Sequence, residues 1–248
     1  LLGENVNSYS HNKNRFPDLL DAVAVLPGVK RVRFTSPHPQ DVDDQMLLVM
    51  RDHVNLCKSI HLPLQAGSDR ILKRMNRTYT RNEYLMLVDQ IRNILPGCGL
   101  TTDIIVGFPG ETQKDFEKTL AVMEEVKFDS AFTFKYSPRP GTKASEYEAV
   151  VPEEEKQVRL DELLVLQKCH TLFRNSQEVG KTVDVLVEKE SKKSSEQWAG
   201  RTDNNKWVVF SKENAEIGEI VKVTIKDAKG ITLFGELMKN RENADAIA

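Results

Sequence analysis

The chain has 248 residues, enough for one large domain or for a medium-sized domain followed by a small one. With 40% hydrophobic residues, 29% charged residues and a net charge of −2, it has the composition of a globular protein and lacks the basic excess of a generally nucleic-acid-binding chain. No apolar run approaches the roughly 18 residues of a membrane-spanning helix, and the start, Leu1-Leu2-Gly3, shows no signal peptide and suggests a fragment of a longer protein.

The first 140 residues alternate between short β-branched runs and helical patterns. Strands are predicted at residues 29–35, 59–64, 100–106 and 131–136. Helices are predicted at residues 15–26, 43–52, 69–75, 81–95 and 113–126. Alternation of this kind favours a mostly parallel sheet covered by helices, and it leaves open whether the sheet is open or closed into a barrel.

The last hundred residues follow a different pattern. Pro152 and three glutamates open a long helix that continues to about Phe173. Five strand signals follow, at residues 183–187, 198–200, 206–210, 220–225 and 231–237, and polar turns separate them. This pattern predicts a small all-β barrel of the OB-like kind.

Three cysteines, Cys57, Cys98 and Cys169, lie far apart and form no pair with metal-ligand spacing. We therefore expect separate reduced thiols in a cytoplasmic protein, with no disulfide framework and no metal site formed by this chain alone.

Polar, proline- and glycine-rich segments follow all four predicted parallel strands, where ligands gather in such sheets. They are residues 36–39, 63–68, 107–111 and 137–142. Each has a purely structural alternative: residues 107–111 as a tight turn, Gln65 as a helix cap, Arg139 in a surface ion pair and His38 in an exposed loop. Together they predict a binding site on one rim.

These same segments carry a resemblance to a known family. Residues 1–9, 33–39, 61–69, 102–112 and 136–142 are similar to the motifs of MiaB-type radical-SAM methylthiotransferases, and residues 200–205 resemble the GRTENN segment of TRAM domains. The matches are collinear from residue 1 to about residue 238. Two positions depart from the pattern: Glu4 replaces the usual Gln, and Ala66 the usual Ser.

The resemblance implies an α/β fold, namely a partial (β/α) radical-SAM barrel of parallel strands over residues 1–176, followed by an OB-like TRAM barrel over residues 177–240. It also implies S-adenosylmethionine and two [4Fe–4S] clusters in the parent protein. The family's cluster-binding cysteines are absent from this chain, so the chain by itself is expected to hold no cluster and to be inactive.

The resemblance further implies cofactor-binding and RNA-binding residues, while the catalytic residues stay unassigned. The expected contacts to S-adenosylmethionine are Gln65, Ser68, Asp103 and Arg139, with Glu4 and Asn5 on the strand nearest the cluster loop. Asn7 and His38 are expected to face the substrate base. Candidates for RNA contacts in the β-domain are Arg201, Lys206 and Trp207, and the alternative for Trp207 is core packing. A second group of candidates is the basic run Arg70, Lys73, Arg74, Arg77 and Arg81, for which the alternative is a solvated helix face.

The implied function is addition of a methylthio group to C2 of N6-isopentenyladenosine at position 37 of tRNA, in the anticodon loop, with a separate reductant protein and no membrane partner. Three alternatives stay open: a sister methylthiotransferase that modifies another tRNA adenosine or a ribosomal protein, a non-catalytic RNA-binding fragment, and a metabolic barrel enzyme with an accessory β-domain. The TRAM-like segment has no explanation in the last of these. A cytoplasmic location is expected, or an organellar one in a eukaryote.

Overall fold

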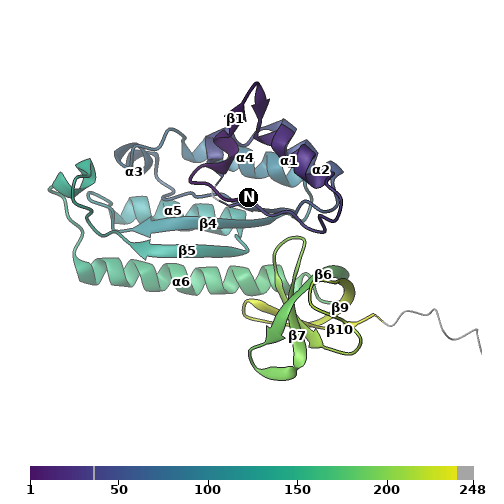
Figure 1. Cartoon of the computed structure of the whole chain (residues 1–248). Helices are drawn as coiled ribbons and strands as arrows, with labels where there is room; N and C mark the ends of the chain where they lie inside the picture. Colours follow the sequence, from purple (N-terminus) through teal and green to yellow (C-terminus); the bar gives the residue numbers. More distant parts are fainter. Residues whose placement is uncertain (36, 239–248) are drawn as a thin grey trace, which may run out of the picture. The chain divides into compact units, whose positions relative to one another are not determined.

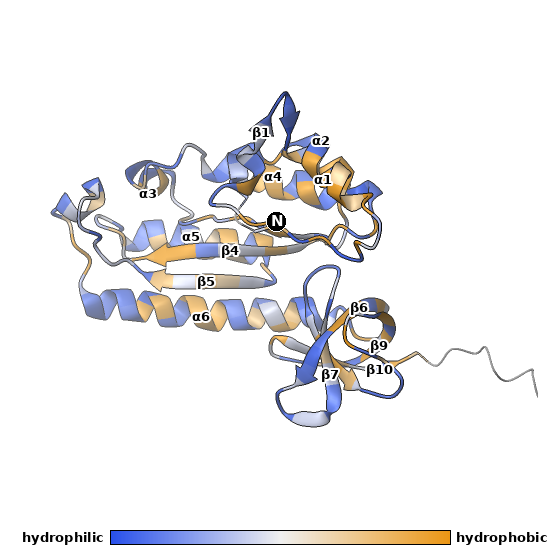
Figure 2. Ribbon diagram, in the orientation of Figure 1, coloured by the Kyte–Doolittle hydropathy of each residue, from blue (hydrophilic) through white to orange (hydrophobic). Residues whose placement is uncertain are grey.

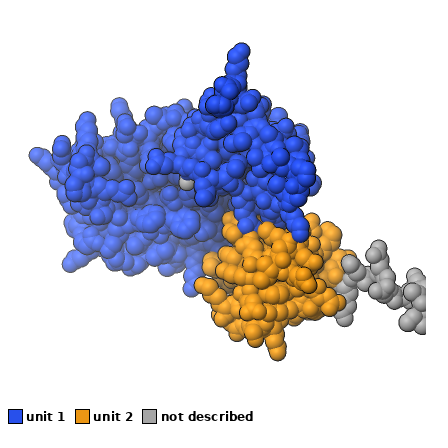
Figure 3. All heavy atoms as spheres, viewed as in Figure 1, with its two compact units in different colours: residues 1–171 blue, residues 172–248 orange. Residues whose placement is uncertain are grey.

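The computed structural model of the chain describes residues 1–35 and 37–238. Its internal contacts divide it into two compact units, Leu1–Thr171 and Leu172–Ala248 (Figure 3). Two parts of the predictions lie outside the described residues. They are Ser36, which follows the first predicted strand, and residues 239–240, which end the predicted second domain.

A three-stranded parallel sheet forms the centre of the first unit. Its strands are β3 (Ser59–His61), β4 (Gly99–Val106) and β5 (Ser130–Lys135), with β4 in the middle. The prediction of parallel strands in these three places is confirmed. Hydrophobic residues gather at the arrow end of β4 (Figure 2), which suits a strand packed between layers.

The strand predicted at residues 29–35 is wrong. The described residues of this segment form no strand and make one isolated parallel β-bridge, between Val32 and Leu56. The Val32 amide donates to Asn55 O at 2.8 Å, and the Cys57 amide donates to Val32 O at 3.0 Å. Val32 is a buried apolar side chain between charged residues at positions 30, 31 and 33. The alternation of apolar and polar residues is therefore too short to support a longer run of strand pairing.

Helices cover the sheet as predicted, within two residues at each end. They are α1 (Phe16–Ala24), α2 (Asp44–Asp52), α3 (Asp69–Arg74), α4 (Arg81–Ile94) and α5 (Gln113–Val126). Capping boxes start α4 and α5: Thr80 pairs reciprocally with Glu83, and Thr112 with Asp115. These reciprocal bonds satisfy amide groups that a helix start leaves free, which is why the sequence located both starts.

A short antiparallel hairpin, β1 (Ser10–His11) with β2 (Asn14–Arg15), was not predicted. Its two turn residues, Asn12 and Lys13, both have positive φ, at 49° and 72°. Positive φ at both positions is the geometry of tight two-residue hairpins. Lysine is an unusual residue there, and the sequence signal was therefore weak.

The long helix α6 (Glu153–Ser176) runs alongside β5 (Figure 1). The side chain of Gln167 donates to Phe128 O at 2.9 Å, and the ammonium of Lys156 donates to Tyr136 O at 3.3 Å. Arg159 pairs with the buried Glu111 at 2.6 Å. The helix thereby fixes the segments that precede and follow β5. None of the helices in the described residues has the length and apolar content needed to cross a membrane.

Five strands of the second unit close into a barrel in the order β10-β8-β7-β6-β9. They are β6 (Thr182–Ser191), β7 (Ser194–Thr202), β8 (Trp207–Ser211), β9 (Ile220–Lys229) and β10 (Thr232–Leu237). All neighbours are antiparallel except β10 and β8. Inward-facing side chains such as Val185, Phe210 and Leu233 fill the interior. The prediction of a small five-stranded barrel is confirmed.

Candidate functional site

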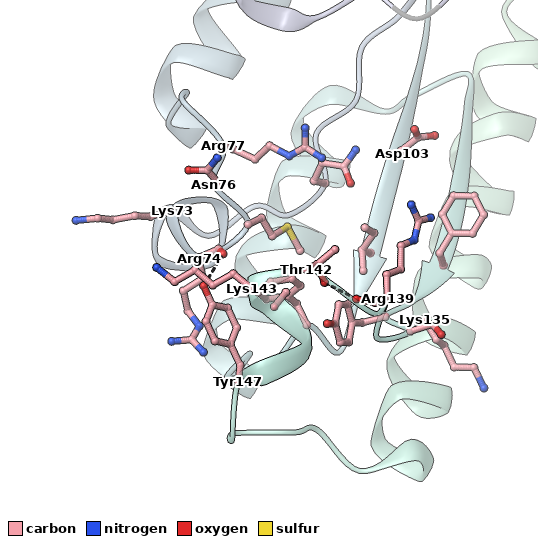
Figure 4. Close-up of a pocket in the computed structure, with 18 residues that line it drawn as sticks. Lys73, Arg74, Asn76, Arg77, Asp103, Lys135, Arg139, Thr142, Lys143 and Tyr147 are labelled. Atoms are coloured by element: carbon pink, nitrogen blue, oxygen red, sulfur yellow. Dashed lines mark hydrogen bonds between the residues drawn. The ribbon is translucent and has the colours of Figure 1, made fainter. Parts of the chain in front are cut away.

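The carboxyl ends of β4 and β5 open into a cavity of about 920 Å³ (Figure 4). One part of its wall comes from Gln65 and β4, a second from the end of α3, and a third from the segment after β5. Its polar lining residues are Gln65, Lys73, Arg74, Asn76, Arg77, Asp103, Lys135, Tyr136, Ser137, Arg139, Thr142, Lys143 and Tyr147. Three of the four residues predicted to contact the cofactor, Gln65, Asp103 and Arg139, therefore line one cavity.

Gln65 continues the line of β3 through an isolated bridge to Ile104. Its amide donates to Asp103 O at 2.8 Å, and its carbonyl accepts from the Ile105 amide at 2.9 Å. Its φ is +69°, a conformation that costs a non-glycine residue about 1–2 kcal/mol. The hydroxyl of Tyr79 supports this strained segment by bonding to Leu64 O at 3.1 Å, and burial raises the pKa of Tyr79 to about 12.

Ser68 takes a different position from the one expected. Its side chain is fully buried, and its hydroxyl donates to Asp115 Oδ1 at 2.6 Å, away from the cavity lining. The preceding Gly67 explains why. A Cβ at Gly67 would lie 2.5 Å from Lys118 O, so this turn packs directly on α5 and turns Ser68 toward the start of that helix.

Asp115 collects the hydrogen bonds at this helix start. Ser68, Arg70 and Thr112 all donate to its carboxylate. Burial by itself would raise the pKa of Asp115, but these donors outweigh burial and hold the pKa below its usual range. The group is thus a charged structural anchor beneath the rim.

Asp103 points from β4 toward the cavity and meets His61 of the neighbouring strand. The His61 Nε2 atom lies 3.3 Å from Asp103 Oδ2, and Nδ1 lies 2.9 Å from Thr101 Oγ1. His61 and Thr101 are register partners, so one histidine spans two residues on the same face of β4. His61 had not been singled out from the sequence. The sequence feature that could have identified His61 is its place at the end of a predicted buried strand.

A second, smaller cavity of about 230 Å³ shares Gln65, Arg77 and Asp103 with the first. Its other lining residues are Glu4, Pro37, His38, Pro39, His61, Pro63 and Tyr79. The ring of His38 stands edge-on to Tyr79, with 6.3 Å between centroids. His38 and Glu4, which were predicted for different ligands, thus lie in the same cavity.

Asn5 and Asn7 hold the His38 loop in place. The Asn7 amide group donates to His38 O at 3.0 Å and accepts from the His38 amide at 2.7 Å. Asn5 donates to Asp41 Oδ2 at 2.9 Å and lines neither cavity. Asn7 is buried, so the structure gives it a role in positioning His38, whereas we had expected it to face a substrate base.

The basic run at residues 70–81 does not form one solvated face. Arg70 binds Asp115, Arg74 donates to Pro109 O at 3.1 Å, and Arg81 lies 3.6 Å from Glu125. Arg74 also stacks over Tyr147, with 4.4 Å from Cζ to the ring centroid. Of the five basic residues, Lys73, Arg74 and Arg77 have no ion-pair partner among the described residues.

Arg139 follows β5 in a turn that the next residues close. Its carbonyl accepts from the Thr142 hydroxyl at 2.8 Å, and Gly141 has a φ of +80°. The Arg139 side chain points into the cavity, as does that of Arg77 from the other side, while Lys73 points away (Figure 4).

In the barrel, Trp207 lies outside the hydrophobic core. Its half-buried ring has Lys189 Nζ 4.4 Å and Arg201 Cζ 4.9 Å from its centroid. Arg201 also pairs with Glu188 at 3.0 Å. Lys206 differs from expectation, because it is buried and its ammonium donates to Asn175 Oδ1 at 2.8 Å. The structure thus makes Lys206 a residue that supports the barrel, not an exposed phosphate contact.

Cys57 and Cys98 are buried at the amino-terminal ends of β3 and β4, and Cys169 is exposed on α6. In the described part of the chain, histidine, cysteine and acidic residues form no group of three that could hold a metal ion.

The chain is similar to two protein families. The Radical SAM superfamily matches residues 5–123, and the TRAM domain matches residues 176–238. Among curated relatives, proteins named tRNA-2-methylthio-N(6)-dimethylallyladenosine synthase are 50% identical over 244 residues in Porphyromonas gingivalis, 51% over 241 residues in Parabacteroides distasonis and 47% over 244 residues in Desulfitobacterium hafniense.

These alignments cover 96%, 95% and 97% of this chain and 53%, 53% and 55% of the respective relatives. The chain thus spans about half the length of the curated relatives that it matches.

Proposed function

We propose that the protein to which this chain belongs is a tRNA methylthiotransferase, because residues 5–123 match the Radical SAM superfamily and residues 176–238 match the TRAM domain. The proposed reaction adds a methylthio group to C2 of N6-isopentenyladenosine in the anticodon loop. The observation that carries the proposal is the 50% identity to a tRNA-2-methylthio-N(6)-dimethylallyladenosine synthase over a span that includes both cavities and the barrel. With tRNA as substrate, the protein would work in the cytoplasm, or in an organelle of a eukaryote.

The polar groups of the larger cavity suit S-adenosylmethionine. The amino-acid end of this cofactor has an ammonium and a carboxylate, and the cavity offers the Asp103 carboxylate and the Arg139 guanidinium. Charge-assisted hydrogen bonds of this kind are about twice as strong as neutral ones. When bound beside a reduced iron–sulfur cluster that donates one electron, the cofactor would supply the radical chemistry that activates an unreactive C–H bond.

In this proposal the chain's own residues bind and orient. Arg139 holds the carboxylate and Asp103 the ammonium, while His61 limits the rotation of Asp103. Gln65, fixed by two backbone hydrogen bonds to β4, offers its amide to the ribose. The proposal also includes two iron–sulfur clusters and a protein that reduces them. The ligands of these clusters would come from residues other than those described in this chain.

The experiment is a complementation in bacteria. The complete gene is expressed in a strain without its own methylthiotransferase, and tRNA nucleosides are measured by mass spectrometry. We expect wild type and the exposed-site control Asp89→Asn to restore 2-methylthio-isopentenyladenosine, and Asp103→Asn and Arg139→Gln to restore little. Absence of the methylthio nucleoside with wild type, or full activity of both cavity variants, would overturn the proposal.

A further inference from the structure

Two arginines point into the larger cavity from opposite sides, and the proposed cofactor accounts for one of them. Arg139 follows β5, and Arg77 follows α3 (Figure 4). Arg77 also lines the smaller cavity, so its guanidinium lies where the two cavities meet. S-adenosylmethionine has a single carboxylate, which leaves Arg77 available for a second anion.

The backbone holds Arg77 in this place. Asn76 ends α3 with a φ of +58°. Its amide donates to Lys73 O at 3.1 Å, and the Arg77 amide donates to Leu72 O at 2.9 Å. These two bonds form a Schellman motif, which terminates a helix and fixes the direction of the residue after the left-handed one. The position of Arg77 is therefore built into the helix end and does not depend on its side chain.

The side chain of Arg77 is not neutralised by the protein. Its Nε atom is buried and has no hydrogen-bond partner among the described residues, and no carboxylate there lies within ion-pair distance. Asp103, the acidic residue shared by both cavities, is paired with His61. A buried guanidinium atom without a partner is unfavourable unless a ligand supplies an acceptor.

The smaller cavity indicates which anion this is. Rings of His38, His61 and Tyr79 and three prolines line it together with Glu4, Gln65 and Asp103, and this mixture of ring faces and polar groups suits a base taken out of the stack of an RNA loop. A base placed there carries its phosphates to the mouth of the cavity, beside Arg77. We propose that Arg77 binds a backbone phosphate of the RNA next to the nucleotide to be modified. This inference rests on the proposed function, because it takes RNA as the substrate.

The test measures RNA and cofactor binding separately on the intact protein. Binding of a fluorescent anticodon stem-loop is followed by anisotropy at several salt concentrations for wild type, Arg77→Gln, Arg77→Lys and the control Arg51→Gln. Arg51 is an exposed arginine that pairs with Asp52 and lines neither cavity, and its substitution changes the net charge by the same amount. Binding of S-adenosylmethionine is measured by calorimetry.

We expect Arg77→Gln to weaken RNA binding about tenfold and to lower the salt slope by roughly 0.7–0.9, the effect of one phosphate contact. Arg77→Lys should keep the slope and lose only part of the affinity, because it keeps the charge but not the planar fork. Affinity for S-adenosylmethionine should stay within twofold of wild type, and Arg51→Gln should change neither RNA affinity nor cofactor affinity.

Three results would overturn the inference. Equal RNA affinity and equal salt slope in wild type and Arg77→Gln would show that Arg77 makes no phosphate contact. A loss of cofactor binding with unchanged RNA binding would make Arg77 a cofactor ligand. If wild type itself bound no RNA, the proposed function would fail together with the inference, whereas the first two results leave that function standing.

Discussion

Asp115 shows how a single charged residue supports the rim without facing a ligand. Four donor groups from three residues surround its buried carboxylate, so Asp115→Asn should lower the free energy of unfolding by about 1.5–3 kcal/mol, the usual loss for hydrogen bonds to a charged group. Chemical denaturation measures this loss. Asp89→Asn, at an exposed position, should change the free energy of unfolding by less than about 0.5 kcal/mol.

The pH dependence of this effect has a definite sign. The pKa of Asp115 is lowered by folding, so the unfolded state binds more protons near and below pH 4. The stabilisation is complete above the unfolded pKa and is lost as the pH falls toward the folded one. The difference between wild type and Asp115→Asn should therefore shrink in acid, and a difference that grew in acid would contradict this account.

Sequence reasoning found the residues whose position follows from a strand end and missed those set by packing. Gln65, Asp103 and Arg139 follow or end strands, and the parallel order brings them to one cavity. Ser68 was misplaced because contact of the preceding turn with α5 decides its direction. Lys206 was misplaced because its partner, Asn175, lies on a helix far back in the sequence.

At the scale of secondary-structure elements, the turn between β3 and α3 packs tightly against α5. A methyl group at Gly67 would lie 2.6 Å from the Thr119 Cα atom, and the backbone of α5 cannot move without disturbing the capping box at its start. Overpacking of this kind costs about 1–3 kcal/mol, and we expect that loss for Gly67→Ala. Thermal unfolding measures it, with Gly3→Ala as the control, since a Cβ there would come no closer than 3.5 Å to its neighbours. Equal stability of the two variants would show that α5 yields easily.

The helices were located well because capping residues and apolar periodicity agree, as at Thr80 and Thr112. All five barrel strands were located, but β6, β7 and β9 were underestimated in length. β6 and β7 extend through Lys189 and Glu196, where polar residues occupy both faces of an exposed hairpin and the alternation vanishes. Hydrophobic patterning therefore detects only the part of a strand that borders the core.

The outer face of the barrel gives a prediction about RNA. We expect Trp207→Ala to weaken binding of a tRNA anticodon stem-loop by about 1–3 kcal/mol, the usual contribution of one stacked base, without loss of fold. Lys206→Ala should instead lower the unfolding temperature, because it removes the bond to Asn175 inside the unit. Anisotropy and thermal unfolding of both variants test the assignment, which the reverse pattern of effects would refute.

At the scale of the whole molecule, the first unit is built on a parallel sheet whose strand ends form two adjoining cavities, and the second unit is a barrel that carries cations around an aromatic ring. Under the proposed function, the first unit would bind the cofactor and the target base, and the second unit would bind additional RNA. Its fold class was predictable from element order, and so were the cavity residues that end or follow strands, whereas the side chains placed by packing were not.

The most direct test is a crystal structure of the protein with S-adenosylmethionine. We predict the cofactor in the larger cavity, with its carboxylate within hydrogen-bond distance of Arg139 and its ammonium beside Asp103. Arg77 should remain free of the cofactor at the entrance to the smaller cavity. Cofactor bound elsewhere, or bound here without contact to either Arg139 or Asp103, would contradict the account.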